Sequence, residues 1–273
     1  MLDLEHPLLE LVLRDVIAQG RRAVLYTTDD IAAVASRLAA ATRVAVLTGA
    51  GVSVASGVPT FRGPDGLWRR FRPEELATPQ AFARDPELVW QWYDWRRGLI
   101  AACQPNRAHL VLAAWSRHFP QFTLITQNVD GLHEAALTRH LVCLHGSIWD
   151  VKCSRPCAAG AEPWRDDRVP IGERLPRCPH CGSLLRPAVV WFGESLDPVV
   201  LERASAAADC DVFFAIGTSA VVYPAASLLP AARRRGACTV EINPAVTEAS
   251  GHVDFALAGA AEIVLDEIDR AMR

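Results

Sequence analysis

Short apolar runs alternate with longer segments of helical periodicity along most of this chain. Runs of four or five mainly apolar residues, bounded by turn residues as in buried strands, lie at 44–47, 122–126, 141–144, 189–192, 212–216 and 239–242. Apolar residues recur with helical spacing at 29–41, 108–117, 199–208, 225–235 and 262–272. Strands that alternate with helices in this way predict the α/β class, with a doubly wound parallel sheet.

Between residues 152 and 186 the apolar periodicity lapses, and prolines, charged residues and cysteines take its place. We interpret this segment as a small module inserted into the sheet domain. The predicted division is an N-terminal helical extension at 1–30, in which 4–17 has helical spacing, the sheet domain at 31–148 and 187–273, and the module at 149–186. A Trp-rich helical region within 64–105 is expected to form a further part of the small domain.

Composition narrows the class of protein. The chain has 273 residues, 51% apolar and 22% charged, which is ordinary for a globular protein with a full core. A net charge of −3 gives no reason to expect nucleic acid or an anionic membrane as a partner. No run approaches the roughly 18 consecutive apolar residues of a membrane span, and the first residues are acidic, unlike a secretory signal. These features predict a cytoplasmic protein and leave its oligomeric state open.

Four of the eight cysteines form two closely spaced pairs. Cys153 and Cys157 enclose three residues, Cys178 and Cys181 enclose two, and twenty residues separate the pairs. Two such knuckles match four thiolates around a tetrahedral zinc ion. Four cysteine ligands leave no open coordination position, so this zinc is expected to be structural. The other four cysteines lie among apolar residues and are expected to pack as small hydrophobic side chains.

Residues 44–63 join a predicted strand to a turn rich in small residues. Gly49 and Gly51 follow the strand, and glycine lets a backbone press against a bulky ligand because no Cβ intervenes. A helix that opens here would aim its free N–H groups at an anion. The dinucleotide fingerprint G-x-G-x-x-G is incomplete, however, because Val54 stands where the third glycine belongs. We therefore expect a nucleotide-like ligand in a pose unlike that of a dehydrogenase.

Polar residues follow the other predicted strands as well, at 127–130, at His145, at 217–219 and at Asn243. Ligands of doubly wound sheets bind outside the carboxyl ends of the strands, so these residues predict one site. His145 is the candidate general base, because imidazole titrates near neutral pH; the alternative is a structural histidine. Asn128 and Asp130 offer hydrogen bonds to ribose hydroxyls or to a nicotinamide amide.

Seven motifs together resemble the sirtuin family: GAGVS at 49–53, SGVPTFRG at 56–63, TQNVDGLH at 126–133, LHGS at 144–147, VVWFGE at 189–194, GTS at 217–219 and IN at 242–243. With the paired cysteines, the match covers roughly residues 30–270. The family consists of NAD-dependent protein lysine deacylases. The resemblance implies a Rossmann-like domain with a small zinc-binding domain, NAD as a consumed co-substrate, and acyl-lysine proteins as substrates. The products would be free lysine, nicotinamide and 2′-O-acyl-ADP-ribose.

Site residues carry over by position in these motifs. The resemblance implies His145 as the base that activates a ribose hydroxyl, and Val190, Trp191 and Phe192 along the acyl-lysine tunnel. The residues that would bind NAD are Gly49, Ala50, Gly51, Ser53, Gly57, Pro59, Thr60, Phe61, Arg62, Trp68, Gln127, Asn128, Val129, Asp130, Gly217, Thr218, Ser219, Asn243, Pro244, Ala245 and Ala261.

The acyl group is indicated by the Trp-rich region. Tyr93 and Arg96 are three residues apart and so share one helix face, with the small Ala77 upstream. This combination resembles the sirtuin branch that removes succinyl and malonyl groups. In physical terms, Arg96 can bind a terminal carboxylate, and Tyr93 adds a hydrogen-bond donor. On the residues alone, Tyr93 could instead be a core residue and Arg96 a solvated helix charge.

Several other functions remain open at this point. Within the same enzyme class, the chain could be a plain deacetylase or a mono-ADP-ribosyltransferase. From a different class, it could be a non-catalytic NAD-sensing or zinc-mediated interaction module, which fits poorly with His145 and Asn128. A hydride-transferring dehydrogenase is disfavoured by the incomplete fingerprint and by the lack of a ribose-binding acid about twenty residues further on.

Overall fold

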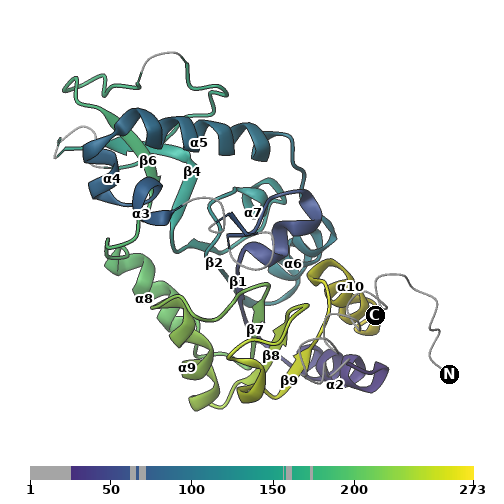
Figure 1. The fold of residues 1–273 in the computed structure, drawn as a ribbon. Helices are drawn as coiled ribbons and strands as arrows, with labels where there is room; N and C mark the ends of the chain where they lie inside the picture. Colours follow the sequence, from purple (N-terminus) through teal and green to yellow (C-terminus); the bar gives the residue numbers. More distant parts are fainter. Residues whose placement is uncertain (1–25, 62–65, 68–71, 156, 158–161, 173–174) are drawn as a thin grey trace.

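A computed structural model describes residues 26–61, 66–67, 72–155, 157, 162–172 and 175–273 (Figure 1). The predicted helix at 4–17 lies outside the described residues. The described part contains a six-stranded parallel sheet and a three-stranded antiparallel sheet. No helix of this part is both long and apolar enough to span a membrane.

The parallel sheet confirms the predicted α/β class. Its strands, in the spatial order β3-β2-β1-β7-β8-β9, are β3 (Leu141–Cys143), β2 (Gln121–Thr126), β1 (Arg43–Thr48), β7 (Val212–Ile216), β8 (Cys238–Ile242) and β9 (Phe255–Leu257). From the central β1 the chain adds β2 and β3 on one side, then β7, β8 and β9 on the other. The order therefore reverses between β1 and β7, which is where ligands of open α/β sheets bind.

Alternate residues of the central strands point to opposite faces of the sheet, and helices cover both faces. Val44 and Val46 pack under α2 (Thr28–Ala39), α6 (Arg107–His118) and α10 (Ala261–Ala271). Ala45 and Leu47 pack under α8 (Pro198–Ala206) and α9 (Leu228–Arg234). Because both faces are buried, these strands are continuously apolar. Shorter elements complete this unit: η1 (Ala50–Ser56), α7 (Leu132–Ala135), η3 (Ala225–Ser227) and η4 (Ser250–His252).

The smaller unit lies beside the carboxyl ends of the parallel strands (Figure 1). Its sheet has the order β5-β4-β6, with β5 (Trp164–Arg165), β4 (Gly146–Cys153) and β6 (Leu185–Val189). This sheet shares one hydrophobic cluster with residues of α3 (Pro73–Leu76), α4 (Pro79–Arg84) and α5 (Pro86–Ala101). Pro79 and Pro86 each stand at the first position of a helix, where proline is tolerated, so the Trp-rich region is divided into separate helices.

One predicted strand was placed in the wrong sheet. Residues 189–192 were expected in the parallel sheet, whereas the strand is β6 (Leu185–Val189), which pairs antiparallel with β4. The N–H of Val190 continues this pairing by donating to the carbonyl oxygen of His145 at 2.9 Å. The short apolar run was a strand signal, but a run of this length does not encode which strand it joins.

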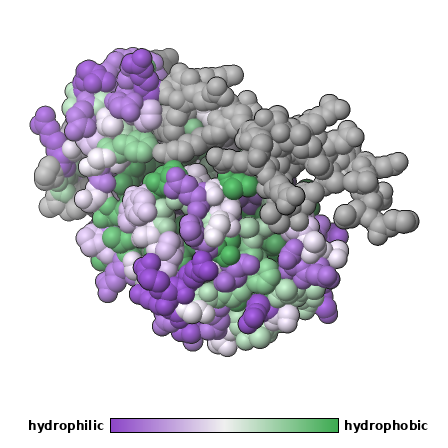
Figure 2. Space-filling model, turned by 60° about the horizontal axis from the view of Figure 1, so that its bottom comes forward, coloured by the Kyte–Doolittle hydropathy of each residue, from purple (hydrophilic) through white to green (hydrophobic). Residues whose placement is uncertain are grey.

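Hydrophilic and hydrophobic residues are interspersed over the described part of the face seen in Figure 2, with hydrophobic residues also visible toward its centre. Thirteen large apolar side chains in the described residues are exposed, among them Phe192, Val221 and Tyr223. These three also line the cavity at the strand ends, so the apolar character of that cavity extends to the surface.

Candidate active site

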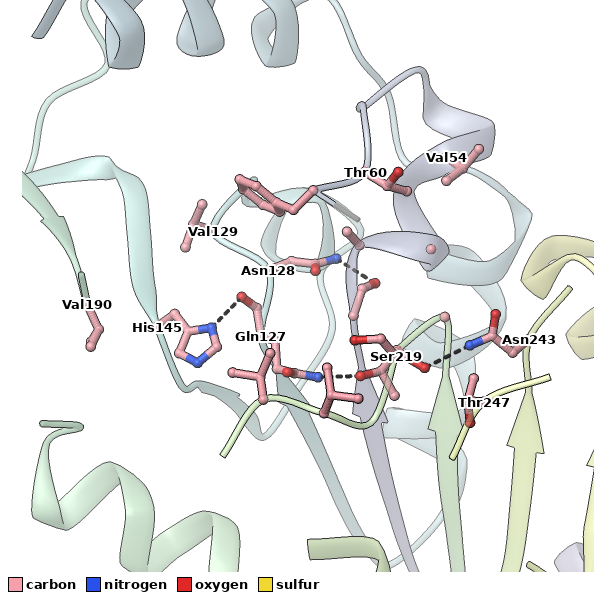
Figure 3. A pocket seen from close by; sticks show the side chains of 18 of the residues that line it. Val54, Thr60, Gln127, Asn128, Val129, His145, Val190, Ser219, Asn243 and Thr247 are labelled. Carbon is pink, nitrogen blue, oxygen red and sulfur yellow. Dashed lines mark hydrogen bonds between the residues drawn. The ribbon is translucent and has the colours of Figure 1, made fainter. Parts of the chain in front are cut away.

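A cavity of about 1250 Å³ lies at the carboxyl ends of β1, β2, β7 and β8. Its wall includes residues of the parallel sheet's loops, such as Gln127 and Asn243 (Figure 3). It also includes residues of the smaller unit, such as Tyr93. Ligand pockets for a single small molecule are typically about 300–1,000 Å³. This larger cavity has room for a dinucleotide together with part of a second substrate.

Most of the predicted site residues meet in this one cavity. Those that line it are Gly49, Ala50, Gly51, Thr60, Phe61, Ala77, Tyr93, Arg96, Gln127, Asn128, Val129, His145, Val190, Trp191, Phe192, Gly217, Thr218, Ser219, Asn243, Pro244, Ala245 and Ala261. The polar strand ends that the sequence placed at one edge of the sheet therefore do come together.

Four predicted residues lie elsewhere, and two lie outside the described residues. Ser53 and Asp130 are buried and do not line the cavity. Gly57 and Pro59 also lie away from the wall, and Gly57 ends η1 with a φ of 92°. Arg62 and Trp68 fall outside the described residues.

Ser53 and Asp130 support the cavity from behind. The Ser53 hydroxyl donates to Asp130 Oδ2 at 2.8 Å and accepts from Asn128 Nδ2 at 3.2 Å. Asn128 Nδ2 also donates to the Gly49 carbonyl oxygen at 3.1 Å. Burial raises the pKa of Asp130, while bonds from the Leu132 N–H and the Ser53 hydroxyl oppose that shift. These contacts fix the side chain of Asn128 in the cavity wall, so Ser53 and Asp130 act through Asn128.

The glycines after β1 have a packing role that the sequence did not suggest. A Cβ on Gly49 would lie 2.7 Å from the Gly217 carbonyl oxygen, and one on Gly51 would lie 2.6 Å from Gly217 Cα. Their N–H groups donate to the carbonyl oxygens of Ile216 and Gly217 at 3.0 and 2.9 Å. These two N–H groups are therefore already used inside the protein. The absence of a side chain at Gly49 and Gly51 is therefore required for close contact between the ends of β1 and β7, in addition to any approach by a ligand.

Side chains also bridge the reversal point of the sheet. Gln127 Nε2 donates to Thr218 Oγ1 at 2.9 Å, and Asn243 Nδ2 donates to the Thr218 carbonyl oxygen at 2.7 Å (Figure 3). Three strand ends, those of β2, β7 and β8, are thus tied together through Thr218. The result is a preformed polar floor for the cavity.

His145 lies between β3 and β4, with Val190 beside it (Figure 3). Its Nδ1 is 2.9 Å from the Gln127 carbonyl oxygen. A carbonyl can only accept, so Nδ1 carries the hydrogen and Nε2 keeps its lone pair. Burial lowers the pKa of His145, partly offset by the Gln127 carbonyl, so the ring is neutral at pH 7. His145 is therefore set to accept a proton at Nε2.

Arg96 and Tyr93 lie on α5, and both are buried, with 5% and 3% of their surface exposed. The Arg96 guanidinium lies 4.6 Å from the centroid of the Phe61 ring and 5.0 Å from that of Trp92. In the described part of the chain, no hydrogen bond or ion pair joins Arg96 to another residue. Burial lowers the pKa of Arg96 accordingly. The alternative of a solvated helix charge is wrong: this is a buried cation in a cavity wall.

The predicted zinc ligands form one cluster. The Sγ atoms of Cys153, Cys157, Cys178 and Cys181 all lie within 4.8 Å of one another. Tetrahedral Zn–S bonds of about 2.3 Å place the sulfurs roughly 3.8 Å apart, so the four thiols fit a zinc ion with little movement. None of the four lines the cavity. Their position agrees with a closed structural site rather than a catalytic one.

Two sequence comparisons bear on the identity of the chain. The profile of the Sir2 family matches residues 49–224. An NAD-dependent protein deacylase from Aquifex aeolicus is 53% identical over 205 residues, which cover 75% of this chain and 84% of that protein. NAD-dependent protein deacylase 1 from Archaeoglobus fulgidus is 52% identical over 228 residues, covering 83% and 91%. The chain belongs to the Sir2 family.

Solved structures agree with this assignment. A Sir2 homolog–NAD complex superimposes with a TM-score of 0.82 at 48% identity, covering 88% of this Sir2 protein and 93% of that chain. A Sir2–p53 peptide–NAD⁺ complex gives a TM-score of 0.74 at 27% identity, covering 88% and 96%. The predicted family and fold are confirmed. The cofactor prediction is confirmed as well, since Sir2 proteins are NAD-dependent and the cysteine cluster is compatible with zinc.

Sequence reasoning missed several residues of the cavity wall. They are Val54, Ala55, Trp92, Gly193, Glu194, Ser195, Leu196, Leu201, Val221, Val222, Tyr223, Pro224, Ile242, Val246, Thr247, Glu248, Ala260, Glu262 and Val189. Many directly follow a motif that was recognised, such as GTS at 217–219, so the signal was proximity along the chain. Trp92 had no such signal, because aromatic residues of this region are equally suited to a core.

Proposed function

We propose that this Sir2 protein is an NAD-dependent protein lysine deacylase that removes acidic acyl groups, succinyl and malonyl, from lysine side chains. One observation carries the choice of acyl group: the buried Arg96 guanidinium lines the cavity beside Tyr93 and forms no hydrogen bond or ion pair with a described residue. NAD is consumed, and the products are free lysine, nicotinamide and 2′-O-acyl-ADP-ribose.

Family membership and the cavity support NAD as co-substrate. Relatives at 53% and 52% identity are named NAD-dependent protein deacylases, and a solved relative holds NAD. Gln127, Asn128 and Asn243 present polar groups on the cavity floor, where nicotinamide, ribose and adenosine could be hydrogen-bonded. The supporting bonds from Ser53 and Thr218 keep these amides oriented before any ligand enters.

His145 supplies the base. In the proposed reaction the acyl oxygen attacks the anomeric carbon of the nicotinamide ribose, and the bond to nicotinamide breaks. His145 Nε2 then takes a proton from the ribose 2′-hydroxyl, which attacks the acyl carbon. The bond from that carbon to the lysine nitrogen breaks, and the amine leaves with a proton. Water adds to the acyl carbon, whose bond to the 1′-oxygen then breaks to give 2′-O-acyl-ADP-ribose. The Nδ1–H bond to the Gln127 carbonyl oxygen holds the ring in the tautomer that leaves Nε2 free. A positioned general base contributes about 10²- to 10⁴-fold to a rate.

Arg96, Tyr93 and Ala77 select the acyl group. A succinyl or malonyl chain ends in a carboxylate, which a guanidinium binds by charge-assisted hydrogen bonds worth about 1.5–3 kcal/mol each. Such a bond corresponds to about ten- to a hundredfold in discrimination. Ala77 also lines the cavity, and its small side chain leaves room for the acyl chain. Its carbonyl oxygen accepts from the Phe192 N–H at 2.9 Å, which holds the two segments together. Acetyl-lysine still fits and is expected to react as a secondary substrate.

The proposal is tested by side-by-side kinetics. Peptides of one sequence that carry succinyl-, malonyl- or acetyl-lysine are assayed at saturating NAD, with nicotinamide release and peptide deacylation measured together. A kcat/KM for succinyl and malonyl peptides above that for acetyl supports the proposal. Preference for acetyl would make the protein a plain deacetylase, and nicotinamide release with ADP-ribose attached to protein would make it a transferase. NAD binding without nicotinamide release would indicate a sensing module.

A further inference from the structure

Trp191 donates its indole N–H to the hydroxyl oxygen of Tyr93 at 2.9 Å. An indole nitrogen is a donor only, so in this bond the Tyr93 oxygen is the acceptor. No other hydrogen bond to that oxygen involves a described residue. The phenolic hydrogen is thus left for a different acceptor, and it must point away from Trp191.

Tyr93 keeps this hydrogen throughout the range in which enzymes work. Burial raises the pKa of Tyr93 to about 12, with the nearby Arg96 charge opposing the shift. The neutral hydroxyl and the Arg96 guanidinium lie on one face of α5, and both line the cavity. Together they form a pair of donors in the cavity wall, and Trp191 occupies the other side of the hydroxyl.

The indole of Trp191 is itself held from several directions. The Arg186 guanidinium lies 3.4 Å from the indole ring centroid, and the Phe82 ring lies 5.4 Å away on α4. The backbone N–H of Trp191 donates to Glu194 Oε2 at 2.9 Å. Arg186 donates to both carboxylate oxygens of Glu194, at 2.5 and 2.9 Å. This one ion pair therefore supplies both the guanidinium that stacks on the Trp191 ring and the carboxylate that accepts from the Trp191 backbone. Trp191 is 3% exposed, and its N–H is therefore fixed in direction.

We propose that Trp191 is a positioning residue for acyl-group selectivity, which turns the Tyr93 hydroxyl so that its hydrogen is donated to the terminal carboxylate of the acyl chain beside Arg96. This inference rests on the proposed function above. The carboxylate-terminated acyl chain receives N–H donors from Arg96 and one O–H donor from Tyr93. An acetyl group ends in a methyl group, which cannot accept the hydrogen bond from Tyr93. Trp191 therefore does not act on acetyl-lysine through Tyr93.

The test is a double-mutant cycle on selectivity. The ratio of kcat/KM for succinyl-lysine to that for acetyl-lysine peptide is measured in the wild type, Trp191→Phe, Tyr93→Phe and the double variant. A neutral hydrogen bond is worth about 0.5–1.5 kcal/mol, so Trp191→Phe is expected to lower the ratio about two- to tenfold. Tyr93→Phe is expected to lower it at least as much. With Phe at position 93, Trp191→Phe is expected to change the ratio no further.

Trp90→Phe is the matched control. Trp90 is also buried, and its indole N–H donates at 2.9 Å to the Leu185 carbonyl oxygen, but Trp90 does not line the cavity. This variant loses a comparable buried hydrogen bond, and the selectivity ratio is expected to stay at the wild-type value. A purely structural role for Trp191 would move KM for both peptides together and would leave the ratio unchanged.

The outcomes separate this inference from the proposed function. If Tyr93→Phe and Arg96→Met both leave the ratio unchanged, the acidic-acyl function fails and the Trp191 role fails with it. If those two variants lower the ratio, and Trp191→Phe acts equally with Tyr or Phe at position 93, only the Trp191 role is overturned. An unchanged ratio in Trp191→Phe overturns it in the same way.

A measurement without Trp191 variants covers the case in which Trp191→Phe does not fold. In protein labelled with ¹⁵N-tryptophan, Tyr93→Phe is expected to displace one indole N–H resonance strongly. The same resonance in the wild type is expected to move further when a succinyl-lysine peptide is added than when an acetyl-lysine peptide is added, each at saturation. Equal movement with both peptides, or with neither, contradicts the inference.

Discussion

Arg96 and Arg97 are neighbours on α5 and both are buried, yet only Arg97 has hydrogen-bonding partners in the described part of the chain. Arg97 Nε donates to the Ile148 carbonyl oxygen at 2.8 Å, and its NH1 lies 3.8 Å from Asp166. Arg97 thus attaches α5 to β4, whereas Arg96 lines the cavity. A buried guanidinium without a partner is costly, and an anionic substrate would offset that cost.

Arg96→Met is expected to lower kcat/KM for succinyl-lysine peptide by about ten- to a hundredfold, because the charge-assisted bond to the carboxylate is lost. The loss for acetyl-lysine peptide is expected to be much smaller. Arg97→Met is the contrasting variant, and it should reduce both activities through a loss of stability on the order of 2 kcal/mol. Equal losses of both activities in Arg96→Met would exclude carboxylate binding.

The pH dependence of kcat/KM reports on His145. Since burial lowers its pKa below the ordinary value, the neutral form should persist below about pH 6.5. The rate is expected to be flat from neutral pH down to that point and to fall only at lower pH. His145→Gln should remove the activity while the protein remains folded. An acidic limb centred at or above pH 6.5 would contradict the assignment of a desolvated neutral base.

Two further histidines should make the fold sensitive to acid. The rings of His109 and His133 are buried 4.8 Å apart, and burial lowers the pKa of His109 to about 4 and that of His133 well below its ordinary value. The unfolded chain then binds more protons than the folded one, so stability is lost as pH falls from about 6.5 toward 4. For His109 alone the loss at pH 5 is on the order of 2 kcal/mol.

Denaturant unfolding between pH 7 and pH 5 measures this loss. His109→Gln should flatten the dependence, whereas His118→Gln, at the exposed end of α6, should not. Equal slopes in the wild type and in His109→Gln would show that His109 is not the source.

Zinc should be required for stability of the small unit. We expect one zinc per chain by elemental analysis, and Cys178→Ser should reduce that content and lower Tm. Cys103→Ser, at a cysteine outside the cluster, is the matched control and should retain the zinc. Full zinc content in Cys178→Ser would show that the zinc is bound elsewhere.

Glycine substitutions distinguish packing from ligand contact. Gly51→Ala would place a Cβ 2.6 Å from Gly217 Cα, a backbone atom that cannot move aside, so loss of stability is expected even without NAD. Gly98→Ala, where a Cβ on α5 meets no atom within 4 Å, should instead stabilise the protein by about 0.5–1 kcal/mol. Wild-type stability in Gly51→Ala would show that the two strand ends are less tightly packed than the structure indicates.

The sheet and the site's location could be predicted from sequence because they follow from short-range signals. Strands β1 and β7 are largely apolar runs, and polar residues stand directly after β2 and β8, at Gln127 and Asn243. In a parallel sheet such residues must gather at one edge, so His145 and Asn243 could be placed in one site without knowledge of any contact.

Contacts between distant segments could not be predicted. Nothing local distinguishes Arg96 from Arg97, since the difference arises from Phe61 and Ile148 in other parts of the chain. Ser53 and Asp130 stand in recognised motifs, yet their side chains bond each other behind the cavity wall. The pairing of β6 with β4 likewise depends on a segment more than thirty residues away, and not on the run of 189–192 itself.

The most direct measurement of the central claim is mass spectrometry of the products formed from NAD and a succinyl-lysine peptide. The account predicts nicotinamide, the free-lysine peptide and 2′-O-succinyl-ADP-ribose in equal amounts, with the last product strongly reduced in Arg96→Met. Formation of 2′-O-acetyl-ADP-ribose from the acetyl peptide, with no succinyl product under the same conditions, would contradict it.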